Sequence, residues 1–158
     1  MKINNTTIPK SLIGISGAHF VAGELTRKGF IATLTSRNTK GIDILVSDSD
    51  GKKPIAIQVK ATQGKHSPRA WMLSEKAEGI KSDSLFYVFV NLDEVKKGKL
   101  PEFFVVPSKD VSKYAKMGHA DWLKRRGKMG KKHRENPIRM FRDREGKYLN
   151  RWDLLGLD

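Results

Sequence analysis

Three polar residues interrupt two otherwise apolar segments of this 158-residue chain, and together they could hold a metal ion and activate water. Asp43 is the second residue of the run IDILV, at 42–46. Gln58 and Lys60 alternate with apolar residues in a second run, so they project from one face of a strand. A carboxylate and an amide oxygen suit Mg²⁺ or Mn²⁺, which take oxygen ligands. A lysine beside such an ion could orient the attacking water and neutralise charge on a phosphate.

The segments that carry these residues are predicted to form a β-hairpin. Strands are expected at 42–48 and 54–61, and the Asp-Gly pair in the turn between them is a strong hairpin signal. In simple register, Asp43 at the start of one strand lies near Gln58 and Lys60 at the end of the other. One end of the predicted sheet therefore presents an acid, an amide and an ammonium group together.

The rest of the chain is predicted to build a sheet around this hairpin. A helix over 11–28 carries Glu24 beside its apolar stripe, from where the carboxylate could join the other three residues. The most apolar run, 84–92, should form a central buried strand. Strands are further expected at 30–36, 71–74, 103–108 and 138–143, and helices at 74–82, 109–126 and, as a terminal turn packed on the core, 150–157. In the helix at 109–126, Tyr114, Met117 and Trp122 are expected to face inward. This order predicts an α/β fold with a central mixed β-sheet flanked by helices.

Positive charge is concentrated in the C-terminal third of the chain. The whole chain carries a net charge of +14, and residues 109–151 hold 15 basic and 5 acidic residues, a net charge of +10. A polyanion is the expected partner and nucleic acid the main candidate, with a basic surface that has no specific partner as the alternative. Contact with the DNA backbone is predicted for Lys124, Arg125, Arg126, Lys128, Lys131, Lys132, Arg134 and Arg139, joined by His133 when it is charged.

Composition argues against several other classes of protein. No run approaches 18 apolar residues, so we expect no membrane span, and the start of the chain lacks the apolar segment of a signal peptide. The chain has no cysteine, which rules out disulfides and thiolate metal sites and is compatible with the expected cytoplasmic location. The four histidines lack ligand spacing, so a zinc site is not expected.

The helix with Glu24, followed by GIDILV at 41–46 and IAIQVKAT at 55–62, resembles the PD-(D/E)XK nuclease superfamily in its Q-x-K variety. Holliday-junction resolvases and Mrr-type restriction nucleases are among its relatives. The likeness covers 14–62 well and extends more weakly to residue 108. It implies one nuclease-like domain over 1–158, with a restriction-endonuclease-like core at about 10–108 and a basic C-terminal arm at about 109–158.

The resemblance also implies roles for the polar residues. Asp43, Gln58, the backbone carbonyl of Val59 and, less directly, Glu24 would be ligands of Mg²⁺ or Mn²⁺, and Lys60 would assist the attacking water. The implied activity is metal-dependent hydrolysis of phosphodiester bonds in DNA, and a homodimer is possible because family members often pair. Gln58 brings no charge, so it should hold the metal more weakly than a carboxylate.

Three alternatives remain open from the sequence. The chain could be a catalytically silent nuclease-fold module that binds DNA in a defence or mobile-element system. Gly17-Ala18 favours this reading, because many relatives carry Gly-Glu there. It could instead be a basic RNA-binding protein, although no stacking platform of the RRM type supports this. Finally, Asp43, Gln58 and Lys60 could be only the solvated face of an amphipathic hairpin.

Overall fold

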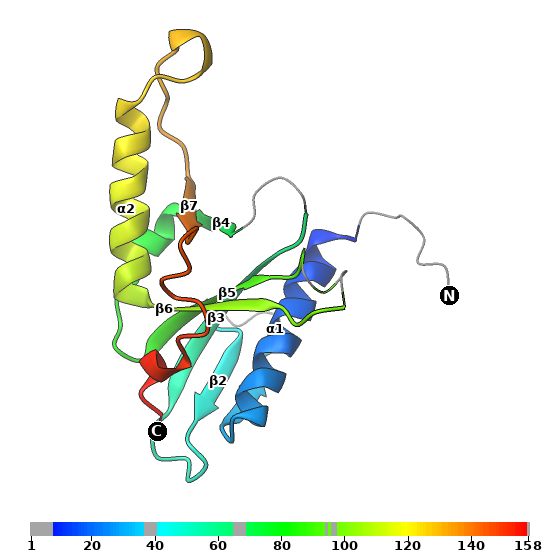
Figure 1. Ribbon diagram of the computed structural model, residues 1–158. Coiled ribbons are helices and arrows are strands. Elements are labelled where there is room, and N and C mark those ends of the chain that lie inside the picture. Colours follow the sequence, from blue (N-terminus) through cyan, green and yellow to red (C-terminus); the bar gives the residue numbers. More distant parts are fainter. Residues whose placement is uncertain (1–7, 37–40, 65–68, 94, 96–97, 158) are drawn as a thin grey trace.

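A computed structural model describes residues 8–36, 41–64, 69–93, 95 and 98–157 (Figure 1). Its centre is a mixed five-stranded sheet with the order β1-β2-β3-β5-β6, in which β3 and β5 are parallel and the other neighbours antiparallel. The strands are β1 (Ile31–Leu34), β2 (Ile44–Ser47), β3 (Ile55–Thr62), β5 (Leu85–Asn91) and β6 (Glu102–Pro107). The predicted α/β fold with a mixed central sheet is confirmed, and β5 is buried almost throughout.

Helix α1 (Lys10–Arg27) covers one face of this sheet (Figure 1). Val21 and Leu25 are fully buried and belong to the same apolar cluster as Ile57 of β3. The helix lies close against the sheet at Gly17, where a Cβ atom would lie 2.5 Å from the Cβ of Ala61. Only a residue without a side chain allows this approach, so Gly17 sets the distance between the helix and β3.

A second layer covers the opposite face, over β5 and β6. It contains a two-stranded antiparallel sheet of β4 (Ala70–Ser74) and β7 (Ile138–Arg142), the short 3₁₀ helix η1 (Glu75–Glu78) and helix α2 (Ser108–Lys124). Its apolar residues pack against the aromatic and aliphatic side chains of β5 and β6. This cluster consists of Trp71, Leu73, Ala77, Tyr87, Phe89, Phe104, Val106, Val111 and Phe141.

The segment predicted as a basic C-terminal arm packs against the central sheet in part. The backbone N–H of Val105 in β6 donates to the carbonyl of Tyr148 at 3.0 Å. Another 3₁₀ helix, η4 (Trp152–Leu155), packs onto the core beneath α1, as predicted for the terminal turn. On α2 the predicted inward position of Met117 is wrong, because its side chain is 56% exposed. Tyr114 is 39% exposed with its ring 4.9 Å from that of Phe141, and Trp122 is half-buried. The buried positions are instead Ser108, Val111, Ser112 and Ala115.

No helix among the described residues is both long and apolar enough to cross a membrane.

Candidate metal and nucleic-acid site

The structure places Asp43 directly beside β3. Ile44 of β2 pairs with Ile57 of β3 in antiparallel register, so the preceding residue, Asp43, lies opposite Gln58. The backbone N–H of Asp43 donates to the carbonyl of Ile57 at 2.8 Å. Its side-chain Oδ2 accepts the N–H of Val59 at 2.7 Å. The carboxylate is therefore held at the peptide bond that joins Gln58 to Val59.

Gln58 and Lys60 lie on the sheet face that α1 does not cover. Val59 between them is buried in the cluster beneath α1, and alternate residues of a strand point to opposite faces. Gln58 pairs with Tyr87 and Lys60 with Phe89 of the parallel strand β5, and both polar side chains are half-buried. The structure thus brings Asp43, Gln58 and Lys60 together at one position along β3, as the hairpin register predicts.

The oxygen atoms around Asp43 are of the kind that a hard cation takes. In an antiparallel pair the N–H and C=O of a residue face the same neighbouring strand. The N–H of Val59 reaches Asp43, so its carbonyl faces the same side. A carboxylate, an amide and a carbonyl oxygen fit Mg²⁺ or Mn²⁺ that keeps several waters. The described residues contain no group of three or more His, Cys, Asp or Glu that could hold a metal, so a carboxylate-rich site is not formed.

Glu24 is not brought to these residues. It belongs to α1, on the face of the sheet opposite Gln58 and Lys60, and its own carboxylate has two cationic partners. Arg27 Nη2 donates to its Oε1 at 2.8 Å, and Lys28 Nζ lies 3.5 Å from the same oxygen. The hydrogen bond from Arg27 holds the pKa of Glu24 below its usual value. Because this charge is already balanced within α1, the arrangement argues against the predicted role of Glu24 as a metal ligand.

Seven of the eight residues predicted to contact phosphate lie exposed at the end of α2 and in the loop that follows. This loop extends beyond the end of the helix, in the yellow-to-orange part of Figure 1. We call residues 124–134 the basic finger. Its exposed cations are Lys124, Arg125, Arg126, Lys128, Lys131, Lys132 and Arg134. Seven exposed cations within eleven consecutive residues are what a segment that contacts the DNA backbone requires.

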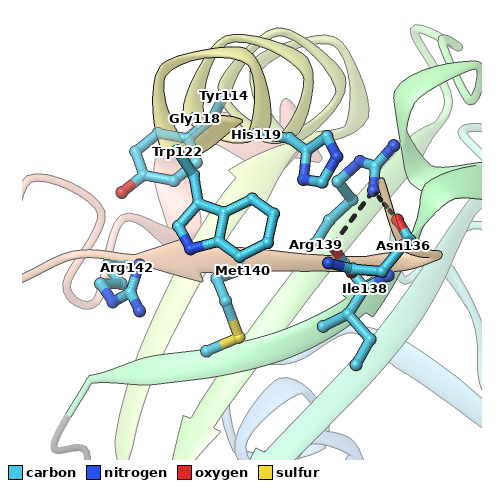
Figure 2. A pocket seen from close by; sticks show the side chains of 9 residues that line it. All are labelled: Tyr114, Gly118, His119, Trp122, Asn136, Ile138, Arg139, Met140 and Arg142. Atoms are coloured by element: carbon cyan, nitrogen blue, oxygen red, sulfur yellow. Dashed lines mark hydrogen bonds between the residues drawn. The ribbon is translucent and has the colours of Figure 1, made fainter. Parts of the chain in front are cut away.

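Arg139, the eighth predicted residue, is buried and has partners within the fold. Its side chain is 6% exposed and forms ion pairs with Glu78 of η1 and, at 3.3 Å, with Glu135. It also donates to the carbonyls of Asn136 at 2.6 Å and Ile138 at 3.1 Å (Figure 2). The structure therefore removes Arg139 from the predicted phosphate contacts. Its guanidinium thus links β7 and the residues that follow the finger, Glu135 and Asn136, to η1.

An aromatic stack that the sequence reading missed supports the finger. Trp122 of α2 stacks on His133 at 4.0 Å and on His119 at 5.4 Å between ring centroids. In Figure 2 its indole points from α2 toward Met140 of β7, over a hollow of about 280 Å³. His119 Nε2 lies 2.6 Å from a carboxylate oxygen of Glu135, and this hydrogen bond lowers the pKa of Glu135. The sequence signal for this stack is the spacing of His119 and Trp122, which are three residues apart and therefore neighbours on one face of a helix.

Comparison with known proteins supplies one likeness at the level of the fold. No family model and no curated protein matches the chain. Among solved structures, that of a bacterial homing endonuclease, I-Ssp6803I, is similar, with a TM-score of 0.58 and 14% sequence identity. The match covers 95% of this chain and 94% of that chain. At this low identity it shows a shared fold, and the fold is shared over nearly the whole length of both chains.

Proposed function

We propose that the protein is a metal-dependent DNA endonuclease that hydrolyses phosphodiester bonds. The observation that carries the proposal is the position of the Asp43 carboxylate, which is held 2.7 Å from the backbone nitrogen of Val59 and beside Gln58 and Lys60. The similarity in fold to a homing endonuclease and the exposed basic finger support it independently. The PD-(D/E)XK resemblance of the sequence agrees with this reading.

The residues have separable roles in the proposed reaction. Asp43, the amide oxygen of Gln58 and the carbonyl of Val59 would hold Mg²⁺ or Mn²⁺, which supplies a water of lowered pKa and a positive charge beside the phosphate. The Lys60 ammonium, on the same face as Gln58, is placed to donate hydrogen bonds to the attacking water or to a phosphate oxygen. Asp43 also accepts the Val59 N–H, and this bond fixes its orientation before a metal binds.

The basic finger would supply most of the DNA affinity. Its seven exposed cations can neutralise phosphates, whereas contacts of this kind do not read sequence. Helix α2 has 17 residues, so it holds the finger about 25 Å from the end of β6. Binding through the finger and chemistry on β3 are thus expected to involve different parts of the protein.

A cleavage assay tests the proposal. Supercoiled plasmid, a fork and a four-way junction are each incubated with the protein in Mg²⁺, in Mn²⁺ and in EDTA. The proposal predicts nicked, linear or resolved product with at least one metal and none in EDTA. Absence of product from all three substrates with both metals would contradict it.

The alternative function is DNA binding without catalysis. Three observations favour it. The described residues form no group of three or more potential metal-ligating side chains of His, Cys, Asp or Glu. Ala18 stands where many members of the superfamily that the sequence resembles have glutamate, and Glu24 is paired with Arg27 and Lys28. A silent module would bind DNA with the salt dependence of the basic finger but would give no product in the assay above. This outcome would separate the alternative from a protein that does not bind DNA.

A further inference from the structure

The tip of the basic finger carries a highly exposed methionine. Met129 is 93% exposed, more than the other exposed large hydrophobic side chains of the described residues. It lies between the exposed cations Lys128 and Lys131 in the short 3₁₀ turn η3 (Lys128–Gly130). A large apolar side chain at the end of a charged projection contributes nothing to the core, and burying it in a partner would be favourable.

The backbone at this methionine is in a conformation that a non-glycine residue rarely adopts. Met129 has φ 60° and ψ 28°, in the left-handed region, at a cost of about 1–2 kcal/mol for a residue with a Cβ atom. The turn is closed by the N–H of Gly127, which donates to the carbonyl of Lys131 at 2.8 Å. The N–H of Gly130 donates to the carbonyl of Gly127 at 3.1 Å. Glycine or asparagine would fit this position with less strain, so stability of the turn does not explain a methionine here.

The base of the finger is held by contacts that give the tip a defined position. His133 stacks on Trp122, and a Cβ atom at Gly127 would lie 3.0 Å from the His133 ring. Arg126 forms an isolated bridge with Lys132, and its Nη1 donates to the carbonyl of Gly130 at 3.4 Å. The finger is therefore a preorganised projection that presents one apolar side chain at its end.

We propose that Met129 is an apolar wedge that enters between base steps of duplex DNA while the surrounding cations bind the flanking phosphates. This inference rests on the proposed DNA-directed function and adds a residue that deforms the duplex. Apolar side chains inserted in this way partly unstack a base step and kink the helix. An unbranched, flexible methionine adapts well to such an irregular gap. Pyrimidine–purine steps deform most easily, so the wedge should favour TA and CA sites.

A basic loop with an apolar tip would also suit an anionic membrane surface. Duplex DNA is the better match here, because 95% of the chain shares its fold with a homing endonuclease and the proposed site on β3 would act on a phosphodiester. Membrane binding is therefore included as an outcome of the test.

The test measures DNA unwinding without cleavage. Plasmid is relaxed by a type I topoisomerase in EDTA with the wild-type protein or with one of three variants, and the change in linking number is read from the topoisomers. Met129→Ala removes the wedge and Met129→Leu keeps an apolar side chain of similar size. Met117→Ala makes the same truncation at an exposed methionine on α2. Affinity for the same DNA is measured by anisotropy.

Wild type, Met129→Leu and Met117→Ala should shift the topoisomer distribution equally, and Met129→Ala should shift it at least three-fold less at equal occupancy of the DNA. Equal shifts for Met129→Ala and wild type, or no shift for wild type that binds the plasmid, would overturn the wedge and leave the endonuclease proposal intact. Failure of the wild type to bind DNA at low salt would overturn both. Binding to vesicles of phosphatidylserine and phosphatidylcholine that is lost in Met129→Ala, with DNA unwinding unchanged, would assign the tip to membranes.

Discussion

Asp43 has a structural contact as well as a proposed chemical role, and this decides how it should be mutated. Its Oδ2 accepts the Val59 N–H at 2.7 Å, so truncation to alanine would leave that donor without its acceptor at a cost of about 1 kcal/mol. Asparagine removes the negative charge but keeps a side-chain oxygen for this hydrogen bond. Asp43→Asn therefore separates the loss of a metal ligand from the loss of local structure.

Gln58→Glu should tighten Mn²⁺ binding, because it adds a negative charge at a position that already presents an oxygen beside Asp43. We expect roughly a ten-fold lower Kd, equivalent to about 1.4 kcal/mol, measured by titration calorimetry without DNA. Gln63→Glu, which adds the same charge beyond the end of β3, is the matched control and should change the Kd little. Equal Kd values for Gln58→Glu and wild type would show that Gln58 does not contact the metal.

Glu24→Gln should affect stability and leave cleavage unchanged. Arg27 lowers the pKa of the Glu24 carboxyl through a hydrogen bond, so the charged form is favoured in the folded state. The stabilisation is present above the unfolded pKa and is lost as the pH falls through the lowered folded pKa. The variant should therefore have a lower free energy of unfolding than wild type at pH 7, by less than about 1 kcal/mol, which lowers its Tm. The difference should shrink toward pH 3. A ten-fold loss of metal-dependent cleavage in Glu24→Gln would instead support a role for Glu24 as a metal ligand.

At the scale of elements, the approach of α1 to β3 depends on Gly17. Gly17→Ala would place a Cβ atom 2.5 Å from the Cβ of Ala61, so the helix must move away from the sheet. We expect a loss of about 1–3 kcal/mol in the free energy of unfolding, measured with urea. Gly14→Ala, in the same helix with no atom within 4 Å of the new Cβ, should instead stabilise the protein by about 0.5–1 kcal/mol. Similar effects of the two substitutions would contradict this packing.

The hairpin and its polar residues could be predicted because local rules determine them. Alternation along β3 assigns Gln58 and Lys60 to one face, and the Asp-Gly turn fixes the register that brings Asp43 to Val59. Glu24 could not be placed in this way. The period of a helix shows which of its residues share a stripe, but it does not show which face of a sheet the helix covers.

Burial of polar residues explains the other differences between prediction and structure. Met117 was expected to face inward, but Ser112 is buried instead because its hydroxyl donates to the carbonyl of Glu78. Arg139 contributes to any count of basic residues, and only the three-dimensional arrangement shows that Glu78 and Glu135 neutralise it inside the fold. Hydrogen-bond partners distant in sequence decide each of these cases.

At the scale of the whole molecule, the basic finger should make DNA binding strongly dependent on salt. If roughly 5 to 7 phosphates are neutralised, log K should fall with log salt at a slope of about −4.5 to −6. Replacing Lys131, Lys132 and Arg134 with glutamine should reduce this slope by about 2 to 3 for every sequence tested. Replacing the exposed Lys10, Lys52 and Lys76 changes the net charge equally but should leave the slope nearly unchanged. Equal slopes for the two triple variants would show that the finger is not the binding surface.

The most direct test of the proposed function compares Asp43→Asn with Asp50→Asn. Asp50 is exposed in the hairpin turn, where it pairs with Lys52 at 2.8 Å, so the same chemical change is made away from the site. Plasmid cleavage in Mn²⁺ and DNA affinity in EDTA are measured for both variants and for wild type. We predict that Asp43→Asn cleaves at least about 100-fold more slowly, since a metal ligand and its charge are lost. Its affinity for DNA should be equal or higher, because a negative charge facing phosphate has gone, and Asp50→Asn should behave as wild type. Cleavage by Asp43→Asn at the wild-type rate would show that Asp43, Gln58 and Lys60 are only the solvated face of a strand.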